Sequence, residues 1–250
     1  MTRLRDFTSA RVDLPAAGES LATAPLLDLR LAHARARDAV HLPLDALSLS
    51  QNLAEQGWPS LVLQSKANSR EEYLRRPDLG RQLNKNASAP LDLLAAPCPY
   101  AIVIADGLSA LAVHRHAAPL LHVLFERLNY RAAEAHPLFI VQQGRVAIGD
   151  AIGQLLRAEL SIVLIGERPG LSSPDSLGVY VTWAPQTCRT DAERNCISNI
   201  HANGLSYEMA AHKLIFLIRE AQRLKLTGVA LKETAGQLLS INHVERRISE

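Results

Sequence analysis

The sequence predicts an α/β fold, with a Rossmann-like, doubly wound and mostly parallel sheet that follows a smaller, mainly helical N-terminal region. Short, continuous apolar runs alternate with helical patterns after residue 99, which is typical of parallel strands buried on both faces. Leu and Ala dominate the apolar residues and only 4% of the chain is aromatic, which argues against an antiparallel sandwich. A chain of 250 residues, 48% of them hydrophobic, is long enough to bury a large core.

Two regions are expected, a mainly helical one over residues 1–95 and a Rossmann-like one over residues 96–250. The first is rich in Leu, Ala and Arg, with a helical pattern over Pro25–Val40 and one candidate strand at Ser60–Gln64. A small polar segment that ends at Pro90 (NKNASAP) is typical of a boundary. We therefore place the division close to this segment.

The second region alternates between strands and helices. Apolar runs predict strands at Tyr100–Asp106, Pro137–Gln142, Leu160–Ile165 and Val179–Trp183, with a further candidate at Gly228–Leu231. Helical periodicity predicts helices at Leu108–Leu128, interrupted at Pro119, and at Val146–Arg157 and Ser206–Lys225. Such alternation favours crossover connections between parallel strands.

Composition excludes several classes of function. The formal net charge is +2, so no strong positive field favours nucleic acid or an anionic membrane surface. The three cysteines form no C-x-x-C pair, which does not fit a secreted disulfide framework. The first residues do not lead into an apolar run and no apolar stretch approaches about 18 to 20 residues. We expect a cytoplasmic protein without a signal peptide, a membrane span or a nucleic-acid partner.

The common catalytic and nucleotide-binding motifs do not occur in the sequence: G-x-G-x-x-G, the Walker phosphate loop, H-E-x-x-H and G-x-S-x-G are all missing. His114 and His116 point to different faces of a predicted helix, and we expect them at the surface. Cys188 and Cys196 have no histidine between them to act as a base or a metal ligand. No catalytic or metal-binding residue is assigned.

Three glycine-containing turns follow predicted strands. They are GERPG at Gly166–Gly170, which contains Glu167 and Arg168, QQGRVAIGD at Gln142–Asp150, and the pair Asp106–Gly107. In a doubly wound sheet, ligands bind outside the carboxyl ends of the strands. The turns therefore predict a shallow platform for a flat or bulky cofactor, and ordinary strand-ending turns with solvated charges are the alternative.

The segments IADGLSA, QQGRVAIGDAIG, LIGERPGLSSPDSLGVYVTWAP and DAERNCISNIHANGLS, in this order, resemble the small subunit of ethanolamine ammonia-lyase. The resemblance extends from YLRRPDLGRQL (Tyr73–Leu83) to GVALKE, which ends at Glu233, and more weakly through the front half. GERPGL followed by R-x-CISNI is a long and specific combination.

The resemblance implies an adenosylcobalamin-dependent lyase that converts ethanolamine to acetaldehyde and ammonia by a radical mechanism. It also implies a hetero-oligomer in which ethanolamine is bound mainly by a TIM-barrel large subunit, while the small subunit closes the cobalamin site. The cofactor carries the radical chemistry, and the protein positions it and excludes water.

The family positions that contact cobalamin match Val146, Glu167 and Cys196 in this sequence. Val146 and Glu167 match without a gap, whereas Cys196 is assigned by its motif, because the preceding loop is about one residue shorter than in relatives. The D-x-H-x-x-G signature, which supplies a histidine to cobalt, does not occur, and His41 has the wrong spacing for it. Cobalamin is therefore expected to keep its own dimethylbenzimidazole on cobalt.

Two alternatives remain at this point. A non-catalytic cobalamin-binding or scaffold protein of the same fold would lack the large subunit, and a self-sufficient dehydrogenase would need the dinucleotide motif that is missing. The short N-terminal leader favours free cytoplasm, with a bacterial microcompartment as the alternative location.

Overall fold

A six-stranded sheet forms the centre of the computed structural model, which describes Phe7, Arg11, Val12, residues 14–86, Leu91, Leu94 and residues 97–131 and 136–231. The strand order is β3-β5-β4-β6-β7-β8. The strands are β3 (Ser60–Gln64), β4 (Tyr100–Ala105), β5 (Leu138–Gln142), β6 (Leu160–Gly166), β7 (Leu177–Trp183) and β8 (Asn195–Ile200). The first four are mutually parallel, whereas β7 and β8 are antiparallel to their neighbours. The predicted α/β class and mostly parallel sheet are confirmed.

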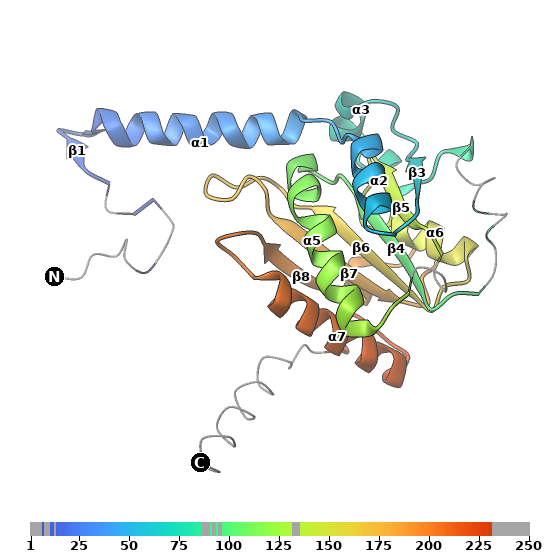
Figure 1. Cartoon of the computed structure of the whole chain (residues 1–250). Helices are drawn as coiled ribbons and strands as arrows, with labels where there is room; N and C mark the ends of the chain where they lie inside the picture. Colours follow the sequence, from blue (N-terminus) through green and yellow to red (C-terminus); the bar gives the residue numbers. More distant parts are fainter. Residues whose placement is uncertain are drawn as a thin grey trace, which may run out of the picture.

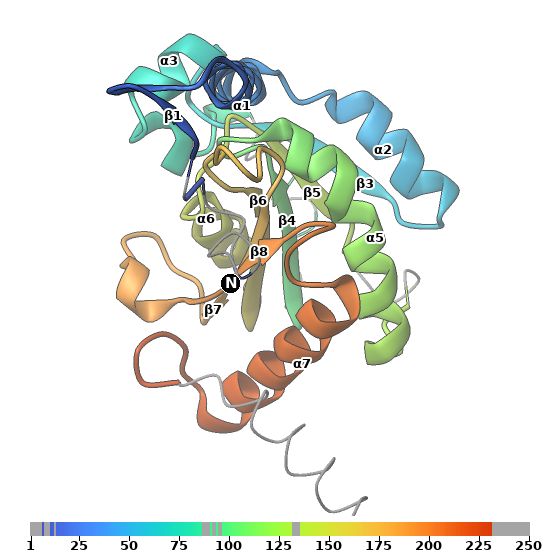
Figure 2. The same ribbon diagram turned by 90° about the vertical axis from the view of Figure 1, so that its left-hand side faces the viewer.

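Helices cover both faces of the sheet. Figures 1 and 2 show α2 (Ala46–Glu55), α5 (Ala110–Leu128) and α7 (Tyr207–Leu224) on one face and α6 (Ile148–Leu155) on the other. Alternate residues of a strand point to opposite faces, so Ile102 and Ile104 of β4 pack towards α5 while Val103 and Ala105 pack towards α6. Burial on both faces explains the continuous apolar runs in the sequence.

The N-terminal elements lie around one end of the sheet. A short pair, β1 (Ala16–Ala17) and β2 (Ser20–Leu21), precedes α1 (Thr23–His41), which extends beyond the sheet in Figure 1. After β3 come α3 (Arg70–Arg75) and the short helix η2 (Leu79–Arg81). β3 pairs with β5, so a segment of the front half belongs to the central sheet. The predicted division between residues 95 and 96 lies outside the described residues, and it stays a prediction.

α6 packs against the sheet through two glycines. A Cβ atom at Gly149 would lie 2.4 Å from Val163 Cγ2, and one at Gly153 would lie 2.4 Å from Pro185 Cγ. Only glycine therefore allows α6 to lie this close to β6. This close contact places the first turn of α6 against the middle of β6.

Several expected elements differ in the structure. α5 continues through Pro119. Proline lacks the N–H that would bond to the carbonyl of Arg115, but both residues are exposed, so water can bond to that carbonyl instead. Gly228–Leu231 is a turn rather than a strand, with Gly228 at φ 89° and a hydrogen bond from the Leu231 N–H to the Gly228 carbonyl. β8 was not predicted, because it is an edge strand with a largely polar pattern.

Candidate functional site

Four parallel strands end at one edge of the sheet, which we call the carboxyl edge. The predicted turns after β4, β5 and β6 all lie there and contact one another. The carboxylate of Asp106, after β4, accepts hydrogen bonds from the Gln143 and Gly144 N–H groups, after β5, at 3.0 and 2.9 Å. The Leu108 N–H donates to the carbonyl of Gly166, at the end of β6, at 2.9 Å. The structure therefore joins the three glycine-containing turns into one rim.

Backbone atoms fill the crevice between the turns after β4 and β6. A Cβ atom at Gly107, which has φ 55°, would lie 2.2 Å from the Gly166 carbonyl oxygen. One at Gly166 would lie 2.0 Å from the Ser109 carbonyl oxygen. Both positions require glycine, since any side chain would separate the two turns. The result is a filled rim at the position where many doubly wound sheets have a ligand cleft.

Glu167 follows β6 directly and connects three segments. Its carboxylate accepts hydrogen bonds from the hydroxyls of Ser176 and Ser198, both at 2.5 Å, and from the Asn199 N–H at 3.2 Å. Gly178 leaves room for it, because a Cβ atom there would lie 2.9 Å from Glu167 Oε1. A carboxylate offers about four lone-pair sites, so with three internal donors the half-buried Glu167 retains capacity for one external donor.

Cys196 is the second residue of β8 and lies directly opposite Tyr180 of β7. Its side chain is exposed at the edge of the sheet. The protein atoms around the sulfur raise the pKa of the thiol, the negative charge of Glu167 raises it further, and a hydrogen bond with Tyr180 opposes the rise. At neutral pH the thiol is therefore protonated, which fits a packing or weakly polar contact rather than a nucleophile.

Val146 lies in the turn between β5 and α6. Its side chain is half-buried and packs against the apolar cluster on the α6 side of the sheet. The carbonyl of Val146 accepts a hydrogen bond from the Gly149 N–H at 3.1 Å, so the residue belongs to the first turn that leads into α6.

The three residues share one face of the sheet. Val163, Tyr180 and Cys196 are consecutive partners across β6, β7 and β8, so their side chains lie on the same face. Glu167 follows Val163 by four residues and, by alternation, lies on that face too. α6, which Val146 precedes, packs on this face against β4 and β6. Beyond α6, Tyr180 is half-buried, whereas Cys196 and Ser198 are exposed. We call the part of this face beyond α6, which contains Tyr180, Cys196 and Ser198, the open face.

A buried ion pair, which sequence reasoning missed, connects α6 to the start of β8. The guanidinium of Arg194 donates to both carboxylate oxygens of Asp150 at 2.7 Å, and the two side chains are only 1% and 2% exposed. Arg194 also donates to the Thr182 hydroxyl and the Arg189 carbonyl. Burial raises the pKa of Asp150, and Arg194 opposes that rise. Asp150 lies in QQGRVAIGD and Arg194 in DAERNCISNIHANGLS, but nothing in their spacing along the chain indicates that they pair.

A second network holds the loop that follows Glu167. The imidazole of His116 lies 2.7 Å from the Tyr207 hydroxyl and 3.3 Å from the Asp175 carboxylate, and the Ser109 hydroxyl donates to the Pro174 carbonyl at 2.8 Å. His116 is buried, so the expectation of a surface histidine was wrong there. Its burial between α5 and α7, with polar partners on both ring nitrogens, could not be read from the sequence.

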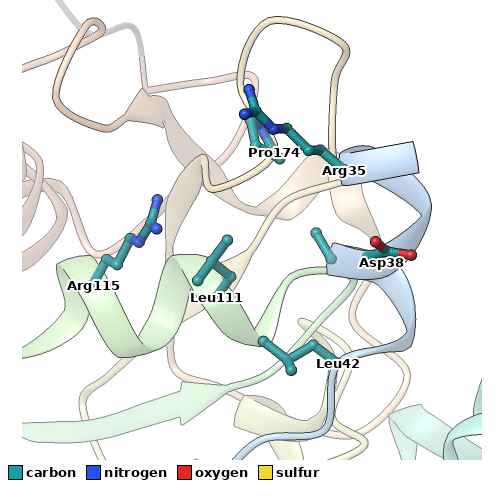
Figure 3. Close-up of a pocket in the computed structure, with 7 residues that line it drawn as sticks. Arg35, Asp38, Leu42, Leu111, Arg115 and Pro174 are labelled. Atoms are coloured by element: carbon teal, nitrogen blue, oxygen red, sulfur yellow. The ribbon is translucent and has the colours of Figure 1, made fainter. Parts of the chain in front are cut away.

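Two hollows are present near these segments. One, of about 440 Å³, lies along the edge strand β8 and reaches to α7, and it is lined by Cys196, Ile197, Ser198, Asn199, Gly204, Leu205 and Lys213. Another, of about 520 Å³, lies between the end of α1, the start of α5 and the Pro174 loop (Figure 3) and is lined by Arg35, Asp38, Ala39, Leu42, Leu111, Arg115 and Pro174. The second hollow contains none of the three predicted residues.

Within the described residues, no group of three or more His, Cys, Asp or Glu side chains could hold a metal ion. None of the described helices has the length and apolarity that a bilayer span requires.

Comparison with known proteins gives consistent matches along the chain. The family model described as ethanolamine ammonia-lyase light chain (EutC) matches residues 1–232. The ethanolamine ammonia-lyase small subunits of Pseudomonas aeruginosa (strain LESB58) and Pseudomonas putida (strain W619) are each 54% identical over 236 residues, which is 93% of this chain and 86% and 87% of those proteins. The small subunit of Pseudomonas syringae pv. tomato is 52% identical over 93% of this chain and 82% of its own length. Together these matches show that the chain belongs to the ethanolamine ammonia-lyase light-chain family.

Proposed function

We propose that this chain is the small subunit of an adenosylcobalamin-dependent ethanolamine ammonia-lyase and closes the cobalamin site against a TIM-barrel large subunit. One observation carries the proposal beyond family membership. Val146, Glu167 and Cys196 come from three separate segments, and all three side chains lie on the α6 side of the sheet. A shared face is what contact with one common ligand requires, so this arrangement supports the proposal.

The open face fits the chemistry of a corrin. A large planar ring with amide side chains needs a broad surface and a few hydrogen-bonding groups rather than a closed pocket. Glu167 retains one acceptor site, Val146 offers an apolar contact, and the hollow beside Cys196 adds polar atoms at the edge of β8. The Rossmann-like interpretation of the sheet belongs to this proposal, with the ligand on the open face beside the filled rim rather than in a cleft between the turns.

Adenosylcobalamin, when bound, supplies the radical chemistry that removes hydrogen from the substrate. The residues of this chain bind and orient the cofactor and keep water away from it. Glu167 is internally hydrogen-bonded and therefore held in one position, and Cys196 stays protonated and unreactive. We assign no catalytic residue to this chain, and ethanolamine is bound mainly by the large subunit.

The partner is required because a flat platform covers one side of a corrin at most. Radical intermediates need a site closed to water, and a second protein must supply the remaining walls. We therefore expect a large, permanent interface around the GERPG and CISNI segments. The cytoplasm is the proposed location, with a bacterial microcompartment as the alternative.

Co-expression with the large subunit tests this function. The complex should elute as one hetero-oligomer in size-exclusion chromatography and release ammonia from ethanolamine with adenosylcobalamin, while this chain alone should be inactive. Separate monomers, or activity of the isolated chain, would contradict the two-subunit assignment. Cobalamin binding without any turnover by the complex would favour a non-catalytic scaffold of the same fold.

A further inference from the structure

The turn Gln143–Val146 is held by residues to which the proposed function gives no role. The two carboxylate oxygens of Asp106 each accept a backbone N–H group, one from Gln143 at 3.0 Å and one from Gly144 at 2.9 Å. From the other side, the hydroxyl of Tyr73 donates to the Gly144 carbonyl at 3.0 Å. Both polar groups of Gly144 are therefore bonded to buried side chains.

Tyr73, on α3, is also the centre of a stacked group. The guanidinium carbon of Arg145 lies 4.5 Å from the centroid of the tyrosine ring, and that of Arg70 lies 5.0 Å from it. A Cβ atom at Gly80 would lie 2.7 Å from the same ring, and the Gly80 carbonyl accepts a hydrogen bond from the Arg145 N–H at 2.8 Å. α3 and η2 are thus packed around the turn, with a fully buried aromatic ring between them.

Arg70 connects this group to the turn after β4. Its guanidinium donates to the Gly107 carbonyl at 2.8 Å and lies 3.4 Å from the Asp106 carboxylate. The charge of Asp106 is therefore partly compensated in a site where its side chain is 1% exposed. Such a carboxylate persists in a core only with partners of this kind.

The held turn contains a strained residue. Gln143 has φ 57°, in the left-handed region that non-glycine residues rarely adopt. Residues in this region persist when the surrounding contacts determine their conformation. Here those contacts include the hydrogen bond from Gln143 N–H to Asp106.

We propose that Asp106 and Tyr73 are positioning residues, which hold the Gln143–Val146 turn in the conformation that presents Val146 to the cofactor. This inference rests on the proposed function, because it takes Val146 as a cofactor contact. Both side chains act through the turn, so their loss lowers cobalamin affinity by releasing Val146 rather than by removing a direct contact.

The carboxyl group of Asp106 gives the proposal a pH dependence. Burial raises the pKa of Asp106 to about 6, and Arg70 and the N–H groups of Gln143, Gly144 and Gly107 oppose the rise. The Tyr73 phenol also interacts with Asp106, and the Arg145 guanidinium lies over the Tyr73 ring. Protonation turns one acceptor oxygen into a hydroxyl donor, so the turn loses one of its two hydrogen bonds as the pH falls through about 6.

This local effect has the opposite sign to the global one. Between the ordinary value of 3.8 and about 6, the folded chain binds the Asp106 proton more tightly than the unfolded chain does. This group alone therefore makes the whole fold less stable as the pH rises, whereas the order of the turn increases. Through Asp106, a rising pH favours global unfolding but disfavours release of the turn, so the two processes can be distinguished by their pH dependence.

The test uses the co-expressed complex and hydroxocobalamin, with affinity measured by absorbance titration and amide protection at Gln143 and Gly144 by hydrogen exchange. Asp106→Asn should weaken binding about tenfold, as expected for the loss of roughly one charge-assisted hydrogen bond. Tyr73→Phe, which keeps the stacked ring, should weaken binding less. Protection of both amides should fall in both variants. In wild type it should fall below pH 6, whereas Asp106→Asn should show no such pH dependence.

Leu124→Ala is the matched control. Leu124 is fully buried in the C-terminal half of α5, so this variant lowers the thermal midpoint while affinity and protection of the turn stay close to wild type. If the wild-type complex binds hydroxocobalamin, and both Asp106→Asn and Tyr73→Phe keep its affinity and its amide protection, the positioning role is overturned while the proposed function stands. An equal loss of affinity in Leu124→Ala would overturn it too. Failure of the wild-type complex to bind hydroxocobalamin would instead overturn the proposed function, and the positioning role with it.

Discussion

Replacement of Glu167 separates its role in the fold from a role at the cofactor. In Glu167→Gln, the retained oxygen can still accept from Ser176 and Asn199, because both bond to the same carboxylate oxygen. The new amide nitrogen can donate to the Ser198 hydroxyl, which accepts as well as donates. All three internal contacts can therefore persist. The free acceptor site is lost, but the second amide N–H can donate to a corrin amide carbonyl instead, so we expect only a modest decrease in cobalamin affinity.

Glu167→Ala removes the acceptor altogether. Ser198 and Asn199 are exposed and can bond to water instead, but Ser176 is 7% exposed and its hydroxyl would lose its partner in a largely buried position. Leaving one such group unpaired costs about 1 to 3 kcal/mol of unfolding free energy. Loss of a charged acceptor for a corrin amide costs a further 1.5 to 3 kcal/mol or so of binding free energy, which is roughly a tenfold to hundredfold weakening.

Two measurements on the assembled complex distinguish these effects. Urea unfolding reports the cost to the fold, and titration with a cobalamin analogue reports affinity. Ser176→Ala is the matched control, since it removes one internal partner but leaves the carboxylate in place, and it should change stability more than affinity. Unchanged affinity in Glu167→Ala, with assembly intact, would show that Glu167 is a structural turn residue and would refute its assignment as a cofactor contact.

Two further predictions concern α6. Arg194→Met leaves the Asp150 carboxylate buried and unpaired and should lower the free energy of unfolding, measured in urea, by about 3 to 5 kcal/mol. Adding Asp150→Leu should restore most of the lost stability. An equal loss in the single and double variants would contradict this account of the ion pair. Gly149→Ala brings a Cβ atom within 2.4 Å of Val163 Cγ2 and should lower the free energy of unfolding by about 1 to 3 kcal/mol. Gly170→Ala, whose Cβ atom would have no neighbour closer than 3.7 Å, should remain within about 0.5 kcal/mol of wild type. Equal thermal midpoints for the two glycine variants would refute the close-contact argument.

Local patterns in the sequence predicted the parallel part of the sheet. β4, β5 and β6 are continuous apolar runs because both of their faces are covered. α7 could be predicted from its periodicity and from Ser206, whose hydroxyl accepts from the Met209 N–H at the start of the helix. Because parallel strands end at a common edge, the position of the turns on one rim followed from the same patterns.

The sequence by itself thus determined the fold class, the family and which turns meet at the carboxyl edge, since each depends on local periodicity or on contiguous motifs. Only the tertiary structure decided that the edge strand β8 places Cys196 on the same face as Glu167, that Arg194 pairs with Asp150, and that Asp106 holds the turn before Val146. These contacts join segments 37 to 44 residues apart, or depend on pairing register at an edge. Spacing along the chain carries no signal for such contacts, because they form only when packing brings separate elements together and removes their charges from water.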